Sequence, residues 1–173
     1  MAGSGDFMRR LMALFSEKPF NFGWVLEDLA VSGRPVTRSQ IQWLLQSGIS
    51  AILSLTEDRI PPYFLEGLDI LYEHIPVPDH HPPYLQDIQR AIEFIDDALS
   101  QGRKVLVHCA AGQGRSGTVV AAYVMYKKGL TSDEALYWIR KTRPGSVDPV
   151  QEEILRAFET FLKLKKERGS GSG

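Results

Sequence analysis

The sequence predicts an α/β domain with a central, mainly parallel sheet of four to five strands and helices on both faces. Three observations support this fold class. Short apolar stretches alternate with segments whose apolar residues recur at helical spacing, which is the pattern of strand–helix–strand units. The chain has 173 residues, a length that fits one domain. Hydrophobic residues make up 43% of it, which is enough for an independent core.

Strands are predicted where short apolar stretches lie between polar or turn-forming residues. These stretches are residues 24–26, 29–31, 49–55, 70–75 and 104–107. The third of them is a candidate for a strand that is buried on both faces. The fourth leads directly into a loop that is rich in proline.

Helices are predicted between and after these strands. The clearest apolar stripe ends before Gly102 and consists of Leu85, Ile88, Ile92, Ile95 and Leu99. Another helix is expected at residues 36–46, and Gly48 is a natural stop for it. After the last strand, we expect a helix at residues 115–128.

Two further helices follow toward the C-terminus. Thr131 and Glu134 have the spacing of a capping box, which predicts the start of a helix that continues to about Thr142. A last helix is expected after Pro149.

The ends of the chain differ in composition from the middle. Residues 1–5 and 169–173 are mostly glycine and serine, so we expect flexible linker sequence there. We therefore divide the chain into an N-terminal extension at 1–19, one domain at 20–165 and a flexible tail at 166–173.

The extension contains an amphipathic segment, residues 7–15, that can form a short helix. Two roles are open for this segment. It packs back onto the domain, which is what we expect, or it attaches to a membrane surface or serves as a targeting peptide. The second role is less favoured because the segment is short, carries two arginines and follows Asp6.

Charge and composition exclude several classes of protein. The net charge is −1, which gives no general attraction to nucleic acid or to a membrane, so we expect neither as a partner. No apolar run approaches the roughly 18 residues of a membrane span. The single cysteine rules out an internal disulfide framework and fits a reducing compartment. We therefore expect a cytoplasmic protein, also nuclear if the source is eukaryotic.

That cysteine begins the most informative motif of the chain, residues 109–115, which we call the cradle loop. The loop follows an apolar strand and precedes a helix, and Arg115 closes it. Its interior residues are Ala110, Ala111, Gly112, Gln113 and Gly114. A tight loop of small residues can aim backbone N–H groups at an anion, and the following helix adds the positive end of its dipole. The planar, charged fork of arginine suits phosphate.

Cys109 lies where those N–H groups converge, and their field favours the thiolate over the thiol. A thiolate can attack phosphorus and form a phosphocysteine. Ser116 is placed to stabilise the sulfur when it leaves, and His108 is expected to orient the loop by hydrogen bonding instead of acting as a base. The alternative is that Cys109 is a small buried hydrophobe. That alternative leaves the arginine, the glycines and the serine unexplained.

A phosphate ester also needs a proton donor for its leaving oxygen, outside the cradle loop. Asp79 is the best candidate, because it lies in a loop at residues 75–83 that four prolines stiffen. A carboxylic acid there can protonate the leaving group and, as a carboxylate, can later activate water. The alternative role for Asp79 is to cap the next helix. Asp87 is a rival acid, although it lies within the predicted helix.

His80 and His81 follow Asp79 directly and suggest the question of a metal site. Two adjacent histidines without a cysteine, an aspartate or a third histidine at ligand spacing make a weak case for metal binding. We therefore expect exposed loop residues here, with no metal and no cofactor.

The Cys-x₅-Arg-Ser motif resembles the active-site loop of the cysteine-dependent protein tyrosine phosphatase superfamily. The sequence is most similar to the small atypical dual-specificity phosphatases and their archaeal relatives, over about residues 20–163. Further matching motifs occur in the expected order at residues 21–25, 54–57, 78–79, 82–83, 139–140, 143–146 and 151–152.

This resemblance implies that residues 20–165 are a dual-specificity phosphatase domain, with the cradle loop between a strand and a helix. It implies that Cys109 is the nucleophile and Arg115 the phosphate clamp. It also implies that Ser116 stabilises the leaving thiolate and that Asp79 is the general acid. For Gln151 two roles stay open: it helps position water near the pocket, or it is an ordinary polar residue in the first turn of the last helix.

The implied activity is metal-independent hydrolysis of phosphotyrosine, and also of phosphoserine and phosphothreonine, in proteins or peptides. Phosphate, vanadate and similar oxyanions are the expected ligands. Relatives that act on phosphoinositides carry lysines inside the loop, so the lysine-free interior here argues against highly phosphorylated lipid head groups. Two alternatives stay open. One is an RNA 5′-triphosphatase, although no long basic cluster lies near the motif. The other is a module that binds phosphate without turnover, although such a module needs neither acid nor nucleophile.

Overall fold

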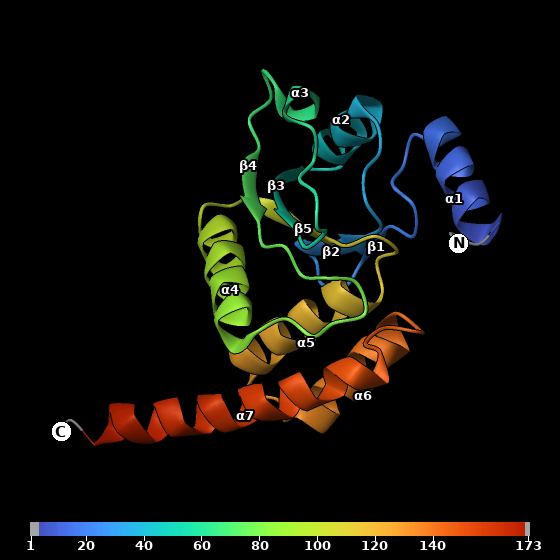
Figure 1. The fold of residues 1–173 in the computed structure, drawn as a ribbon. Helices are drawn as coiled ribbons and strands as arrows, with labels where there is room; N and C mark the ends of the chain where they lie inside the picture. Colours follow the sequence, from blue (N-terminus) through green and yellow to red (C-terminus); the bar gives the residue numbers. More distant parts are fainter. Residues whose placement is uncertain (1–3, 172–173) are drawn as a thin grey trace.

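Five strands form one mixed sheet in the computed structural model, which describes residues 4–171 (Figure 1). The strands are β1 (Gly23–Trp24), β2 (Leu29–Ser32), β3 (Ile49–Ser54), β4 (Leu71–His74) and β5 (Lys104–His108). Their order across the sheet is β1-β2-β5-β3-β4. β1 pairs antiparallel with β2 at one edge, and all other neighbours are parallel. The predicted mainly parallel sheet of four to five strands is therefore confirmed.

The carboxyl ends of the parallel strands meet at one edge of the sheet. His108, the last residue of β5, pairs in register with Ser32 of β2 and with Ser54 of β3. Ser54 in turn pairs with His74, the last residue of β4. The loops that follow these strands are therefore neighbours, and in folds of this class such an edge is where ligands bind. The cradle loop follows β5 at the centre of this edge.

Helices connect the strands and cover the sheet. They are α1 (Ser4–Phe15), α2 (Arg38–Gln46), α3 (Pro62–Leu65), α4 (Leu85–Ser100), α5 (Gly114–Lys128), α6 (Ser132–Thr142) and α7 (Pro149–Ser170). The predicted capping box is present at α6, where Thr131 and Glu134 exchange hydrogen bonds of 3.2 and 2.8 Å. α3 has no counterpart among the predicted helices, because its four residues, the first of which is a proline, are too few to show an apolar stripe.

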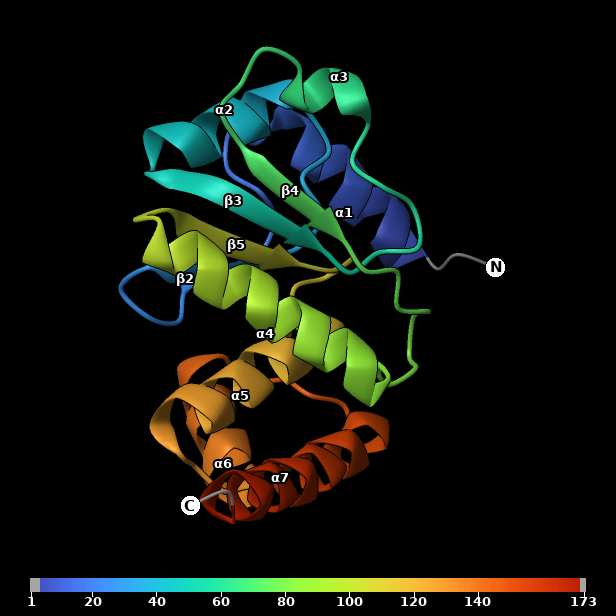
Figure 2. The ribbon, with the colours of Figure 1, turned by 90° about the vertical axis from the view of Figure 1, so that its left-hand side faces the viewer.

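Each face of the sheet has its own hydrophobic core, and the residues of β5 alternate between them. Val105 and Val107 belong to the larger core, which lies between the sheet and the helices α4 to α7. Leu106 belongs to the smaller core beneath α2 and α3. Figure 2 shows these two layers on opposite sides of the strands. The larger core encloses α5, whose residues from Arg115 to Met125 are all buried. The helix that follows the cradle loop is thus surrounded by packed side chains from Arg115 to Met125.

α1 differs from the expectation for residues 7–15. A helix forms there as predicted, but its described large apolar side chains are exposed, with Phe7 at 67% and Phe15 at 84% of full exposure. The expectation that these apolar residues pack back onto the domain is therefore wrong. The chain is attached just after the helix instead, where the Ser16 carbonyl accepts a 3.0 Å hydrogen bond from Gln40 Nε2.

α7 continues through the expected domain boundary at residue 165. Residues 166–170 form the last turns of this helix instead of an irregular tail. Residues 162–168 are leucine, lysine, glutamate and arginine, all with high helix propensity, and Lys163 forms an ion pair one turn back with Glu159. Of the two linker segments expected at the ends, residues 1–3 and 172–173 lie outside the described residues. Within the described part of the chain, no helix has both the length and the apolar character needed to cross a bilayer.

Candidate active site

The cradle loop joins the end of β5 to the first turn of α5, and one of its positions, residue 112, requires glycine. Gly112 has a φ of +73°, a conformation that side chains disfavour. A Cβ atom at this position would lie 2.5 Å from the carbonyl carbon of Ser32 and 2.7 Å from the amide nitrogen of Gly33. The loop therefore packs directly against the backbone at the end of β2.

The carbonyl groups of the cradle loop all have partners on its outer side. Two of these partners are side chains that lie far from the loop in the sequence, those of Asn21 and Arg143. The hydrogen bonds are Arg34 N to Ala110 O (3.2 Å), Asn21 Nδ2 to Ala111 O (3.0 Å), Arg143 Nη2 to Gly112 O (2.9 Å) and Gly117 N to Gln113 O (3.0 Å).

This arrangement turns the amide groups of the loop inward. In a trans peptide, the C=O of one residue and the N–H of the next point in opposite directions. Since the carbonyls of residues 110–113 point outward, the N–H groups of residues 111–114 point toward the centre of the loop. The N-terminus of α5 adds unpaired N–H groups and a positive dipole end at the same place. The loop is thus built to bind an anion with several oxygen atoms.

The sulfur of Cys109 lies at the base of this loop. Cys109 is almost completely buried, and its Sγ atom is 3.2 Å from Oγ of Ser116, which is fully buried in the first turn of α5. The predicted nucleophile and the predicted stabiliser of the leaving sulfur are therefore within hydrogen-bonding distance. Within the described part of the chain, Ser116 is the side chain that contacts this sulfur.

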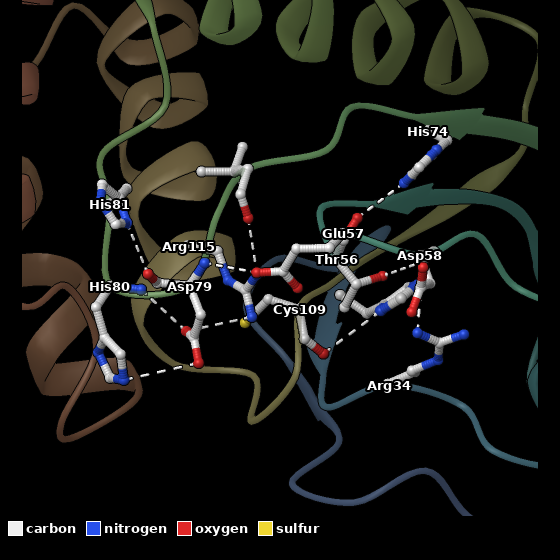
Figure 3. Close-up of polar contacts among 12 residues, drawn as sticks. Arg34, Thr56, Glu57, Asp58, His74, Asp79, His80, His81, Cys109 and Arg115 are labelled. Carbon is white, nitrogen blue, oxygen red and sulfur yellow. Dashed lines mark hydrogen bonds and ion pairs between the residues drawn. The ribbon is translucent and has the colours of Figure 1, made fainter.

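Arg115, the predicted phosphate clamp, is 3% exposed. Its guanidinium contacts the predicted acid Asp79 (Figure 3). Its Nη1 atom donates to the carbonyl oxygen of Val77 at 2.8 Å and to Oε1 of Glu57 at 3.2 Å. Its Nη2 atom lies 3.3 Å from Oδ1 of Asp79. A buried guanidinium needs such partners, and three bonds of this kind fix the direction of its planar fork.

Asp79 is held in the loop between β4 and α4. Its backbone N–H donates to Glu57 Oε1 at 2.6 Å, and its carbonyl oxygen is 2.8 Å from Nδ1 of His81. Its side chain is 56% exposed and therefore accessible to a substrate. The rival acid Asp87 has a different role: its Oδ2 accepts from the Tyr84 N–H at 3.2 Å and caps α4. Asp79, not Asp87, is the acid that the structure brings next to Arg115.

Glu57 completes the group around Arg115. Partial burial on its own would raise the pKa of this carboxyl group. Hydrogen bonds from its own N–H and from that of Asp79, together with the charge of Arg115, outweigh burial and lower the pKa from its ordinary value. Glu57 is therefore an anion at neutral pH, and a permanent partner for the guanidinium.

His108 is buried behind the cradle loop. Its Nε2 lies 2.5 Å from Oγ of Ser54, and its Nδ1 lies 3.4 Å from the carbonyl oxygen of Cys109. Burial lowers its pKa to about 3, and the charges of Arg34 and Arg115 act in the same direction. A neutral ring that donates from Nδ1 and accepts at Nε2 satisfies both contacts. This agrees with the expected orienting role and excludes a proton-transfer role at neutral pH.

Residues 35–160 match the family described as "Dual specificity phosphatase, catalytic domain". The chain belongs to this family.

Named relatives and solved structures agree with this assignment. The human dual specificity protein phosphatase 9 is 38% identical over 143 residues, which are 77% of this chain and 36% of the relative. Dual specificity protein phosphatase Mpk3 of Drosophila melanogaster is 35% identical over 148 residues, 82% of this chain and 34% of the relative. The chain thus spans about a third of the length of these two relatives.

Among solved structures, Tk-PTP in its active form superimposes with a TM-score of 0.74 and is 30% identical, covering 80% of this chain and 96% of that one. DUSP15 superimposes with a TM-score of 0.70 at 30% identity, covering 88% of this chain and 97% of that one. These structures are of similar length to the present dual-specificity phosphatase domain, and they share its fold.

Gln151 links three parts of the dual-specificity phosphatase domain. It is fully buried in the first turn of α7. Its Nε2 donates to the His81 carbonyl at 3.3 Å, while its Oε1 accepts from Thr118 Oγ1 at 3.1 Å and from the Asp148 N–H at 3.3 Å. These contacts give Gln151 a structural function: it ties the loop that carries Asp79 (residues 75–84, the acid loop) to α5 and α7. The role in positioning water stays a prediction.

The two histidines after Asp79 lie at the surface. His80 is 82% exposed, and its ring faces the carboxylates of Asp79 (3.6 Å) and Asp148 (4.0 Å). Within residues 4–171, no three histidine, cysteine, aspartate or glutamate side chains gather where they could hold a metal ion. The described contact of the His81 ring is with the carbonyl oxygen of Asp79, at 2.8 Å.

Several contributors to the site received no role from the sequence. They are Asn21, Arg34, Ser54, Glu57 and Arg143. The sequence signal that pointed to four of them is their place in the motifs that carry the family resemblance: Asn21, Ser54, Glu57 and Arg143. Their function depends on contacts such as Asn21 to Ala111, 90 positions apart, and a single sequence does not reveal such pairs.

Proposed function

We propose that this domain hydrolyses phosphomonoesters of proteins or peptides, without a metal ion, through a phosphocysteine at Cys109. The observation that supports it best is the convergence on Arg115. This buried arginine closes the loop that carries Cys109, and its Nη2 atom lies 3.3 Å from Oδ1 of Asp79. Nucleophile, clamp and proton donor are thus joined in one site. The inward N–H groups and Arg115 supply the positive charge that phosphoryl transfer requires.

In the first step, the Cys109 thiolate attacks phosphorus while the bond between phosphorus and the leaving oxygen breaks. Protonated Asp79 gives its proton to that oxygen, so the product leaves as a neutral alcohol or phenol. The phosphoryl group is now bonded to sulfur, and its oxygens are held by the cradle loop and by Arg115.

In the second step, water attacks phosphorus and the sulfur–phosphorus bond breaks. The Asp79 carboxylate takes a proton from that water, which restores the acid. The sulfur leaves as a thiolate, and the Ser116 hydroxyl at 3.2 Å donates a hydrogen bond to it. Inorganic phosphate is released and the starting state returns.

The contact between Arg115 and Asp79 matters for proton transfer. Because Asp79 Oδ1 is 3.3 Å from Nη2 of Arg115, the carboxyl group lies beside the phosphate oxygens that this guanidinium binds in the proposed complex.

The substrate class that we propose is phosphotyrosine, together with phosphoserine and phosphothreonine, in proteins. The relatives are named dual specificity protein phosphatases, and the interior of the cradle loop carries no lysine. Phosphate and vanadate are the expected ligands, and the single cysteine favours a reducing compartment such as the cytoplasm. An RNA 5′-triphosphatase and a binding module without turnover are not favoured, since the relatives are named protein phosphatases.

The experiment is to trap the intermediate. The protein is mixed with a phosphotyrosine peptide, quenched in acid within milliseconds and digested for peptide mass spectrometry. We expect a phosphoryl group on the peptide that contains Cys109, and none in the Cys109→Ser variant. A phosphoryl group on another residue, or turnover with no trapped intermediate at any time, would contradict the proposal.

A further inference from the structure

Glu57 lies in the bend after β3, and the backbone on both sides of it is fixed. The carbonyl oxygen of Thr56 is 2.8 Å from Nε2 of His74 on β4. The carbonyl oxygen of Asp58 accepts from Thr56 Oγ1 at 2.8 Å and from Arg34 Nη1 at 3.4 Å. Figure 3 shows this bend beside the acid loop. The backbone from which the Glu57 side chain extends is therefore fixed by its neighbours.

One carboxylate oxygen of Glu57 contacts both the clamp and the acid loop. Oε1 accepts from Arg115 Nη1 at 3.2 Å and from the backbone N–H of Asp79 at 2.6 Å. Because Asp79 Oδ1 meets the other nitrogen of Arg115 at 3.3 Å, the three residues close a ring. We propose that Glu57 is a positioning residue that holds the general acid Asp79 in place over the clamp, an inference that rests on the function proposed above.

Asp79 makes few other hydrogen bonds among the described residues. Its carbonyl oxygen contacts the His81 ring at 2.8 Å, and its Oδ1 accepts from the His80 N–H at 3.0 Å. Both of these partners belong to the same loop, whose backbone is otherwise anchored at the carbonyl oxygens of Val77 and His81. Glu57 instead belongs to the bend after β3, so its bond to the Asp79 N–H ties the acid to the sheet.

Glu57 has the properties of an acceptor and not of a second acid. Its interactions with Arg115 and Asp79 favour the carboxylate form, and both nearby donors point at the same oxygen. An ionised acceptor forms the stronger hydrogen bond to a backbone N–H. The hydrogen bonds to the cradle-loop carbonyls do not involve Glu57, so loss of its bond to the Asp79 N–H should free the acid, and the effect should appear in proton donation.

Leaving groups of different acidity separate this role from a merely structural one. A nitrophenol leaves as an anion without help, whereas phenol needs a proton from Asp79. A residue that positions the acid should therefore matter most for the poor leaving group. A residue that only neutralises the charge of buried Arg115 should matter equally for both.

The test compares kcat/KM for 2,4-dinitrophenyl phosphate and phenyl phosphate in the full chain. We expect Glu57→Ala to lose about tenfold on phenyl phosphate and less than about twofold on the dinitrophenyl ester. Glu57→Gln keeps an acceptor oxygen and should recover most of the loss. Asp58→Ala is the matched control and should behave as the wild type, since the contacts of this exposed neighbour among the described residues are made by its backbone carbonyl.

A double-variant cycle completes the test. In an Asp79→Asn background there is no acid to position, so adding Glu57→Ala should cost no further activity on phenyl phosphate. An equal loss on both esters, or losses that simply multiply in the double variant, would overturn the positioning role. The proposed function fails separately: it falls if Cys109→Ser keeps activity, and it stands if Cys109→Ser is inactive while Glu57→Ala affects both esters equally.

Discussion

The buried histidine behind the cradle loop predicts a specific loss of stability in mild acid. The pKa of His108 is about 3 in the folded protein, against an ordinary value of 6.5. Between these values the unfolded chain binds a proton that the folded protein does not. The contribution of His108 to stability is therefore fully present above pH 6.5 and decreases as the pH falls toward 3. At pH 5 the solution is about 1.5 pH units below the ordinary pKa of histidine, so the unfolded chain is protonated at this residue and the folded protein is not. Going from pH 7.5 to pH 5 should therefore lower the free energy of unfolding by about 2 kcal/mol.

Urea unfolding at pH 7.5 and pH 5, followed by the fluorescence of the three tryptophans, measures this loss. His108→Asn retains an amide donor near the position of Nδ1 but does not titrate. We expect the free energy of unfolding of the wild type to fall by about 2 kcal/mol more than that of the variant. His80→Asn, at a histidine that is 82% exposed, is the control and should keep the wild-type pH dependence. Equal losses in the wild type and His108→Asn would refute the assignment of a neutral, buried ring.

Three further predictions concern single positions around the site. Ser146→Ala should raise the free energy of unfolding, measured in urea, by about 1 kcal/mol, because the Ser146 hydroxyl is buried without a partner among the described residues. A loss of stability would contradict the unpaired state of this hydroxyl. Gly112→Ala should reduce kcat/KM and vanadate affinity by at least about tenfold, since its Cβ would lie 2.5 Å from the Ser32 backbone, and unchanged vanadate titration would contradict the packing of the cradle loop. Asp79→Asn should lower kcat by about 100-fold or more while vanadate binding in calorimetry is retained, and unchanged turnover would remove Asp79 from the acid role.

The regular part of the fold could be predicted because its signals are local. The stripe before Gly102 and the capping box at Thr131 depend on residues within one or two turns of each other, and α4 and α6 form there. The apolar stretch at residues 49–55 predicted a buried strand for the same reason, and β3 forms there. α3 escaped prediction because four residues do not reveal a period.

The ends of the chain show where local patterns mislead. An amphipathic pattern predicts a helix at residues 7–15 and leaves open what its apolar side contacts, and the expected partner was wrong. Glycine and serine at the C-terminus suggested irregular chain, whereas α7 extends to Ser170 because strong helix formers precede them.

The candidate site divides in the same way. Cys109, Arg115 and Ser116 lie within eight residues, so their spacing alone predicts a cradle, and the family resemblance gives each a role. Asp79 was selected on loop composition, and its contact with Arg115 across 36 positions emerges from the fold. Contacts of this kind follow from strand order β2-β5-β3-β4, which aligns the ends of four strands and which no local pattern determines.

The central claim is that Cys109 is the nucleophile of a metal-independent phosphatase. It is tested most directly by hydrolysis of para-nitrophenyl phosphate in EDTA, with the wild type and Cys109→Ser compared at equal concentration and matched folding by circular dichroism. We predict that wild-type activity persists in EDTA and that the variant is inactive. Equal activity in the two proteins, or activity in the wild type that EDTA abolishes and added metal restores, would contradict the claim.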